Sequence, residues 1–261
     1  GAGQAGIAMS EHLSCNGIPH LVLERNRIAE RWRSERWDSL VTNGPAWHDR
    51  FPGLEFSNHG PDEFIPKESV ADYFVTYATK INAPIRSGVE VTHLEKIQGQ
   101  RGFRVETSNG VIVTNNLVAA TGPFQCPTMP PIVPENQDIV QMHSTDYRNS
   151  KNLPEGNVLV VGSGSSGVQI AEELLQSGKK VYLSVGPHDR LPRGYRDRDY
   201  VWWLGVLGHW DEQTPIKGRE HVTIAVSGVD GGATIDFRRL SERGMTLVGW
   251  TKSYDNGVIR F

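Results

Sequence analysis

The chain has 261 residues, of which 38% are hydrophobic and 22% charged, and its formal net charge is −3. This is the composition of an ordinary globular protein with one large or two modest domains, and its charge excludes a strong electrostatic attraction to nucleic acid or to an anionic membrane. No apolar run approaches the ~20 residues of a transmembrane helix, and the two cysteines, Cys15 and Cys126, form no C-x-x-C pair. We therefore expect a cytoplasmic protein in a reducing environment.

The chain begins with a glycine-rich turn, GAGQAG, in which the glycines are Gly1, Gly3 and Gly6. In the pattern G-x-G-x-x-G, the first glycine permits a tight turn, the second lets the backbone approach a pyrophosphate, and the third packs a helix against a strand. The sequence predicts a helix that ends at Asn16 and Gly17, followed by a strand over residues 20–24. Because such a turn normally follows a strand, we expect a first strand that precedes the sequence given.

Glu24 ends the second strand of this unit, about 20 residues beyond the turn, where an acidic residue binds ribose hydroxyls. A carboxylate at that position repels a 2′-phosphate, so the first turn fits FAD or NAD better than NADP. The alternative interpretation is a surface glutamate at the end of a strand.

The region between the two glycine turns contains one clear helix and a group of short strands. Residues 68–81 place five apolar side chains on one helical face, which indicates core packing. Residues 89–122 alternate with a period of two around Asn109 and Gly110, which predicts a β-meander with a hairpin. A strand over residues 117–120 then ends at Thr121 and Gly122, before a proline-rich linker.

A second glycine turn, GSGSSG, has a complete strand-turn-helix context. An apolar strand over residues 158–161 leads into Gly162, Gly164 and Gly167, with Ser166 inside the turn, and a helix extends to about residue 176. Full context makes this turn a stronger indication of a dinucleotide site than the glycine pattern alone.

The next strand, residues 180–184, ends in Ser184, where the first unit has a glutamate. The following segment contains Arg190 and Arg193, and guanidinium groups pair well with phosphate. Serine with nearby arginines predicts recognition of a 2′-phosphate, so the second turn is interpreted as an NADPH site. The alternative is a basic, solvated loop beside an NAD site.

Two such turns predict an α/β fold with two Rossmann-like dinucleotide-binding units built on parallel sheets. We expect an FAD-binding domain over residues 1–150, which carries the β-meander, and an NADPH-binding domain over residues 151–261. The nine histidines show no metal-ligand spacing, so no metal site is expected.

The order of FAD turn, A-T-G strand, proline linker and NADPH turn resembles the flavin-containing monooxygenases, the class B flavoprotein monooxygenases, with their plant indole-pyruvate and bacterial relatives. The resemblance implies that Trp32, Thr42, Thr121 and Gly122 border the flavin. It also implies that Asn43 faces the reactive edge of the flavin, where an amide hydrogen-bonds the bound peroxide. The alternative for Asn43 is a purely structural role in the Asn-Gly-Pro turn.

The family's linker fingerprint, F-x-G-x-x-x-H-x-x-x-Y/F, is matched in part by residues 137–147. His143 and Tyr147 are present, whereas Gln137 and Ile139 replace the aromatic residue and the glycine. This departure bears on the subfamily rather than on the family. The family's closing segment, which returns to the FAD domain, does not occur before Phe261, so we expect a fragment that is incomplete at both ends.

The resemblance implies an FAD- and NADPH-dependent monooxygenase that inserts one oxygen atom of dioxygen into a small nitrogen or sulfur nucleophile through a flavin hydroperoxide. The first alternative is an NADPH:acceptor reductase or oxidase without a stable oxygenating intermediate. The second is a catalytically silent nucleotide-binding fragment. The expected partners are the small substrate and dioxygen, without nucleic acid, and a homodimer is left open.

Overall fold

The computed structural model describes residues 1–135, 139–187, 191–213 and 225–261. The chain divides into two compact units. The first comprises residues 1–36, 50–58 and 67–127, and the second comprises residues 37–49, 59–66 and 128–261. The units interleave along the chain, whereas the sequence predicted one boundary at residue 150. The assignment of one nucleotide to each domain stays a prediction.

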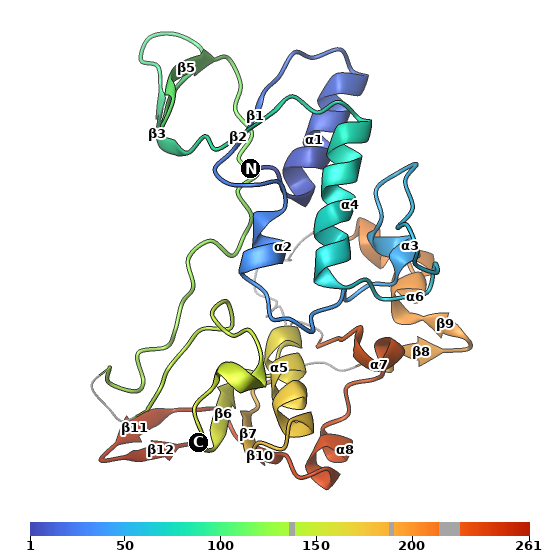
Figure 1. The fold of residues 1–261 in the computed structure, drawn as a ribbon, viewed down its shortest axis with the longest axis vertical. Coiled ribbons are helices and arrows are strands. Elements are labelled where there is room, and N and C mark those ends of the chain that lie inside the picture. The colour runs from blue at the N-terminus through green and yellow to red at the C-terminus, as the bar shows by residue number, and fades with distance from the viewer. Residues whose placement is uncertain (136–138, 188–190, 214–224) are drawn as a thin grey trace. The chain divides into compact units, whose positions relative to one another are not determined.

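The first unit combines helices, a parallel pair of strands and an antiparallel sheet. Its elements are α1 (Gln4–Cys15), β1 (Val22–Glu24), α2 (Glu30–Ser34), α4 (Lys67–Lys80), β2 (Ile85–Ser87), β3 (Val91–Lys96), β4 (Phe103–Thr107) and β5 (Gly110–Thr114). Strands β1 and β2 pair in parallel, and α1 and α4 lie side by side (Figure 1). The expected helix over residues 68–81 is confirmed, and it buries Val70, Tyr73, Phe74 and Tyr77.

Strands β3, β4 and β5 form the expected antiparallel meander. The hairpin between β4 and β5 pairs Thr107 with Gly110, so its two loop residues are Ser108 and Asn109 rather than Asn109 and Gly110. Gly110 has a φ of +113°, a conformation that only glycine adopts without strain. The sequence thus identified the turn correctly and missed its register by one residue.

The expected strand over residues 117–120 is wrong for the described structure, in which these residues are not part of any sheet. A strand is held by backbone hydrogen bonds to a neighbour, and no described strand pairs with this segment. The segment nevertheless runs beside the first glycine turn, because a Cβ added at Gly1 would overlap the carbonyl oxygen of Ala120.

The second unit is built on a three-stranded parallel sheet of order β10-β7-β6. Strands β6 (Val158–Val161) and β7 (Val181–Ser184) are connected by α5 (Ser165–Gln176), which packs on the sheet (Figure 1). The third strand is β10 (Thr246–Val248). This is the strand order of the first half of a doubly wound α/β sheet, and β6 and α5 confirm the predicted strand and helix.

The remaining elements of the second unit are short. They are α3 (Ala46–Asp49), η1 (Ser150–Asn152), β8 (Gly194–Tyr195), β9 (Arg198–Asp199), α6 (Tyr200–Val206), η2 (His209–Asp211), α7 (Val229–Gly232), α8 (Phe237–Glu242), β11 (Ser253–Asp255) and β12 (Val258–Arg260). The core of this unit includes Val168 and Leu174 of α5, Leu183 of β7, Leu240 of α8 and Met245. Across the described ranges, no helix is both long and apolar enough to cross a membrane.

Candidate functional site

The first glycine turn has a shape that side chains would destroy. A Cβ added at Gly6 would overlap the carbonyl oxygen of Gly1, so the backbone of the turn and the first turn of α1 are in direct contact. Gly3 is different, because a Cβ there would meet no atom within 4 Å. The second glycine therefore borders open space, as it does where a pyrophosphate approaches the backbone.

The amino terminus of α1 follows this turn and is not capped by a side chain. The first N–H groups of a helix have no partner within the helix, and they carry a partial positive charge. An uncapped helix start next to an open glycine position is a geometry that fits a phosphate group. The residues of the first turn therefore fit a dinucleotide.

The carboxylate of Glu24 lies at the end of β1 beside the same turn. Its two oxygens accept hydrogen bonds from the backbone N–H groups of Ala2, at 2.7 Å, and Asn26, at 2.8 Å. Glu24 thus fixes the position of the glycine turn from the strand end. Its side chain stays partly exposed, so one carboxylate can both hold the turn and accept hydrogen bonds from ribose hydroxyls.

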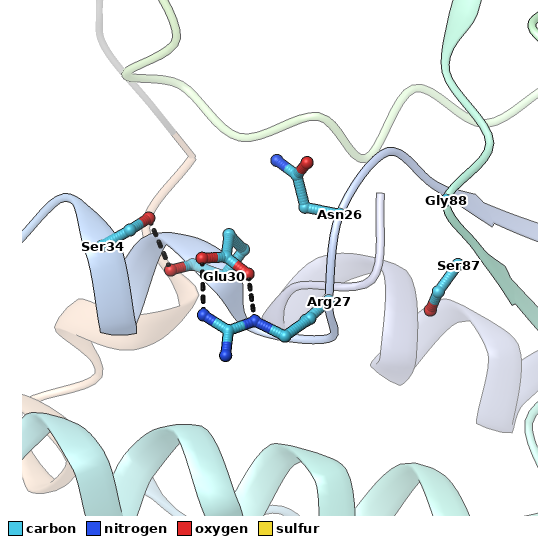
Figure 2. Close-up of a pocket in the computed structure, with 6 residues that line it drawn as sticks. All are labelled: Asn26, Arg27, Glu30, Ser34, Ser87 and Gly88. Carbon is cyan, nitrogen blue, oxygen red and sulfur yellow. Dashed lines mark hydrogen bonds and ion pairs between the residues drawn. The ribbon is translucent and has the colours of Figure 1, made fainter.

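A cavity of about 590 Å³ opens beside this strand end. In Figure 2 its lining comes from the loop after β1, from α2 and from the end of β2, with the residues Asn26, Arg27, Glu30, Ser34, Ser87 and Gly88. The carboxyl ends of both parallel strands therefore reach the cavity, which is where open α/β sheets bind their ligands. The sequence did not predict the cavity, since its walls come from segments about 60 residues apart.

Arg27 and Glu30 form an ion pair along one wall, with 2.6 Å between Nε and Oε2. The hydrogen bond from Arg27 lowers the pKa of the Glu30 carboxyl to about 2. Glu30 is therefore ionised at neutral pH, and its carboxylate and the Arg27 guanidinium are paired with each other along this wall.

The other residues predicted to border the flavin in this unit lie in different places. Trp32 sits on α2, half-buried, with its ring edge-on to Phe74. Thr121 and Gly122 are exposed, and Gly122 has a φ of +84°. Their flavin contacts stay predictions.

The second glycine turn repeats the geometry of the first. A Cβ added at Gly167 would overlap the carbonyl oxygen of Gly162, and a Cβ at Gly164 would meet nothing within 4 Å. The amino terminus of α5 is likewise uncapped, and Ser166 is exposed in its first turn. This turn therefore also fits a dinucleotide phosphate.

Ser184 has other partners than a phosphate. Its side chain is buried, with 3% exposed, and its hydroxyl donates to the carbonyl of Gly249 at 2.9 Å. It also accepts hydrogen bonds from the backbone N–H and the hydroxyl of Thr251. All hydrogen-bonding positions of a hydroxyl are then in use, which weighs against the predicted contact with a 2′-phosphate. The hydroxyl instead ties β7 to the segment after β10.

Arg193 is also buried, with 5% exposed, and its guanidinium pairs with Asp199 at 2.7 Å. The same group donates to the carbonyl of Asn43 at 2.6 Å and lies over the rings of Phe64 and Tyr200. These contacts favour a structural role for Arg193 rather than the predicted phosphate contact.

Arg190, the other arginine predicted to bind the 2′-phosphate, lies outside the described residues, as does Gln137 of the linker. The preference for NADPH over NADH therefore stays a prediction.

Asn43 and Thr42 lie in the second unit. Thr42 is buried, and its hydroxyl donates to the carbonyl of Gly44 and accepts from the N–H of Ile65. Asn43 is exposed, and its side-chain oxygen accepts a hydrogen bond of 2.9 Å from Gln169 of α5. The structure thus brings the predicted catalytic amide to the helix of the second glycine turn.

No sequence pattern predicted a role for Gln169. The one signal in the sequence is a polar residue between the apolar Val168 and Ile170 of α5, and the structure shows that this stretch is buried. Its partner lies 126 residues away, and no local pattern connects the two.

The comparisons with known proteins agree with these features. The family model described as pyridine nucleotide-disulphide oxidoreductase matches residues 1–204. A CzcO-like uncharacterized oxidoreductase of Geobacillus kaustophilus is 41% identical over 80% of the chain and 59% of its own length. The indole-3-pyruvate monooxygenase YUCCA1 of rice is 30% identical over 71% of the chain and 46% of its own length. The chain thus spans about half to three fifths of these relatives.

Solved structures show the same fold. A flavin monooxygenase from Stenotrophomonas maltophilia, in mutant form, covers the whole chain with a TM-score of 0.74 and 20% identity. A bacillithiol disulfide reductase from Bacillus cereus covers 98% of the chain with a TM-score of 0.63 and 18% identity. The repeated glycine turns, the parallel strands and the family match together place the chain in the pyridine nucleotide-disulphide oxidoreductase family.

Proposed function

We propose that the chain belongs to an NADPH-dependent flavoprotein monooxygenase, with FAD at the first glycine turn and NADPH at the second. The observation that carries this proposal is the repetition of one turn geometry in two compact units. Gly6 and Gly167 are both in contact with a backbone carbonyl, while Gly3 and Gly164 both border open space. Two dinucleotides in one chain are what electron transfer from a nicotinamide to a flavin requires.

The chain's own residues then have defined tasks. The amino terminus of α1 and the turn before it hold the pyrophosphate of FAD, and Glu24 accepts the ribose hydroxyls. The amino terminus of α5, with Ser166, holds the pyrophosphate of NADPH. When bound, FAD takes two electrons from NADPH and delivers them to dioxygen.

The proposed reaction consumes NADPH, a proton, dioxygen and a small nucleophilic substrate. It yields NADP⁺, water and the oxygenated substrate. With the cofactor bound, Asn43 would donate a hydrogen bond to the oxygen to be transferred and so oppose its loss as hydrogen peroxide. The similarity to indole-3-pyruvate monooxygenases supports an oxygenase over a simple reductase. The two cysteines, Cys15 and Cys126, are free and far apart in sequence, which offers no support for a disulfide reductase.

The test measures NADPH oxidation, dioxygen uptake and hydrogen peroxide release by the FAD-loaded protein, with a panel of amines and sulfides. A monooxygenase releases less peroxide than the NADPH that it oxidises once a substrate is present, and Asn43→Ala restores equality. Equal amounts of peroxide and oxidised NADPH with every substrate, unchanged in Asn43→Ala, would identify an oxidase instead.

Cofactor preference is tested separately at Arg190, because Ser184 and Arg193 have protein partners. Removing one charge-assisted contact to a phosphate costs about 1.5–3 kcal/mol, so Arg190→Ala is expected to weaken NADPH binding by at least tenfold. NADH binding should not change. An equal loss for both nucleotides would contradict a 2′-phosphate contact.

A further inference from the structure

The orientation of the Asn43 amide follows from the partners of Gln169. The side-chain nitrogen Nε2 of Gln169 donates to two oxygens, each at 2.9 Å. One is the backbone carbonyl of Val226 and the other is Oδ1 of Asn43. Gln169 is buried, with 5% exposed, whereas Asn43 is exposed.

The carbonyl of Val226 removes the usual ambiguity of a side-chain amide. The two ends of an amide are told apart only by their hydrogen-bond partners. A backbone carbonyl can only accept, so Gln169 must turn its NH₂ group toward Val226. The same NH₂ group faces Asn43, so Asn43 must turn its oxygen inward. Its own NH₂ group then points away from Gln169, and it has no protein acceptor among the described residues.

Two neighbouring contacts hold this arrangement in place. The backbone N–H of Val226 donates to the hydroxyl of Ser165 at 3.1 Å, which fixes the carbonyl-bearing segment against the start of α5. Arg193 donates to the backbone carbonyl of Asn43, which fixes the residue from its other side. With the backbone fixed in this way, the remaining variable is the rotation of the Asn43 amide, which determines whether its oxygen or its NH₂ group points outward.

We propose that Gln169 is a positioning residue that orients the Asn43 amide so that its N–H donors face the reacting oxygen. This inference rests on the proposed function of Asn43. If the amide were reversed, an oxygen atom would face the same place, and an acceptor cannot stabilise developing negative charge. Gln169 therefore decides whether the exposed end of Asn43 is a donor.

The first experiment reads the orientation in the protein without cofactors. Side-chain amide signals in ¹H–¹⁵N NMR spectra are assigned by their loss in Asn43→Ala and in Gln169→Glu. The NH₂ signals of Gln169 are expected to exchange with water at least tenfold more slowly than those of exposed Gln176, since both hydrogens are bonded and buried. The NH₂ signals of Asn43 are expected to exchange as fast as those of Gln176. Protected Asn43 signals in the wild type would overturn the inference.

Gln169→Glu is expected to reverse the Asn43 amide. A carboxylate only accepts hydrogen bonds, so Asn43 must then turn its NH₂ inward, and its signals become protected. Gln176→Glu is the matched control, because it adds the same charge to the exposed end of α5, and it should leave the Asn43 signals unchanged. Unprotected Asn43 signals in Gln169→Glu would contradict the inference.

The second experiment measures peroxide release by the FAD-loaded protein with NADPH. Gln169→Glu and Asn43→Asp should both raise the peroxide fraction to that of Asn43→Ala, about a tenfold effect, which corresponds to one lost hydrogen bond. The double variant Asn43→Ala with Gln169→Glu should be no worse than Asn43→Ala. If the buried charge of Gln169→Glu prevents folding, Gln169→Met removes the donors without a charge and is expected to raise peroxide as well.

The outcomes separate the two proposals. A rise in peroxide for Asn43→Ala, with no rise for Gln169→Glu and Gln169→Met, would overturn the positioning role of Gln169 and leave the proposed function standing. No rise for Asn43→Ala would overturn the proposed role of Asn43 in the reaction, and the positioning proposal would fail with it even where the NMR signals show the inferred orientation.

Discussion

The two glycine turns share their steric geometry and differ in what is bonded around them. In both, the third glycine touches the carbonyl of the first, and the second glycine borders open space. At the end of the next strand, Glu24 holds its own glycine turn and stays partly exposed. Ser184 is buried and holds a segment more than 60 residues away. The glycines therefore determine the shape of each turn, whereas the strand-end residue determines whether a side chain is free for a ligand.

The largest expected effect comes from filling the contact that the turns share. In Gly6→Ala and Gly167→Ala, the new methyl group would overlap a backbone carbonyl that cannot rotate away. Such overpacking costs about 1–3 kcal/mol of unfolding free energy, and we expect the upper end. Thermal or urea unfolding measures the loss. Each variant should also lose binding at its own turn, FAD for Gly6→Ala and NADPH for Gly167→Ala, while the other nucleotide still binds.

The strand ends should separate stability from binding. Ser184→Ala leaves the carbonyl of Gly249 and the N–H of buried Thr251 without their partner, and the loss at Thr251 costs about 1–3 kcal/mol of stability. Its ratio of NADPH to NADH affinity should stay the same. Glu24→Gln should weaken FAD binding by about tenfold, through lost charge-assisted hydrogen bonds, and should also leave the N–H of Ala2 or of Asn26 without its acceptor. A changed ratio of NADPH to NADH affinity in Ser184→Ala would instead support the predicted contact between Ser184 and the 2′-phosphate of NADPH.

Substitutions at Gly3 and Gly164, the two glycines that border open space, should separate stability from nucleotide binding more clearly. Gly3 and Gly164 have extended backbone angles that alanine adopts freely, and a Cβ there meets no atom. Gly3→Ala and Gly164→Ala should therefore cost about 1 kcal/mol or less of stability. A dinucleotide that occupies the open space would meet the new methyl group, and its affinity should fall by about tenfold. Titrations with FAD and NADPH that match the wild type would show that no phosphate lies against these turns.

The smallest expected effect is a pH dependence at the cavity beside the first turn. Arg27 lowers the pKa of Glu30 from 4.5 to about 2, so ionisation of Glu30 favours the folded state. Its contribution is fully present above pH 4.5 and is lost as the pH falls toward 2. The Arg27 side chain is 70% exposed, so solvent screens its pairing with Glu30 and keeps the effect small. Unfolding free energies of the wild type and Glu30→Gln should converge over this window, and a constant difference would contradict the shift.

Local patterns predicted the elements around the two glycine turns, helix α4 and the β-meander. The strand of residues 158–161, the helix that follows it and the buried face of α4 match the structure because glycine turns and helical periodicity act over a few residues. Residues 117–120 were predicted as a strand from their apolar character, yet pairing depends on a neighbour that no local pattern supplies. The hairpin register failed by one residue for a related reason, since Gly110 can serve either as a turn residue or as the first residue of a strand.

The candidate site was predicted only where it is local. Gly3, Gly6, Gly164 and Gly167 lie as their spacing indicated. The partners of Ser184 and Asn43 could not be predicted, because Thr251 and Gln169 are 67 and 126 residues away along the chain. Burial and side-chain partners depend on tertiary packing between distant segments, which local sequence patterns do not show.

The interleaving of the units limits how this protein can be recombined with its relatives. Residues 37–49 belong to the same compact unit as α5, so a chimera joined at residue 150 would inherit Asn43 from one parent and Gln169 from the other. Such a hybrid could keep both glycine turns and still carry a misoriented amide. Exchange of the second unit therefore requires three segments to move together, residues 37–49, residues 59–66 and the chain from residue 128 onward.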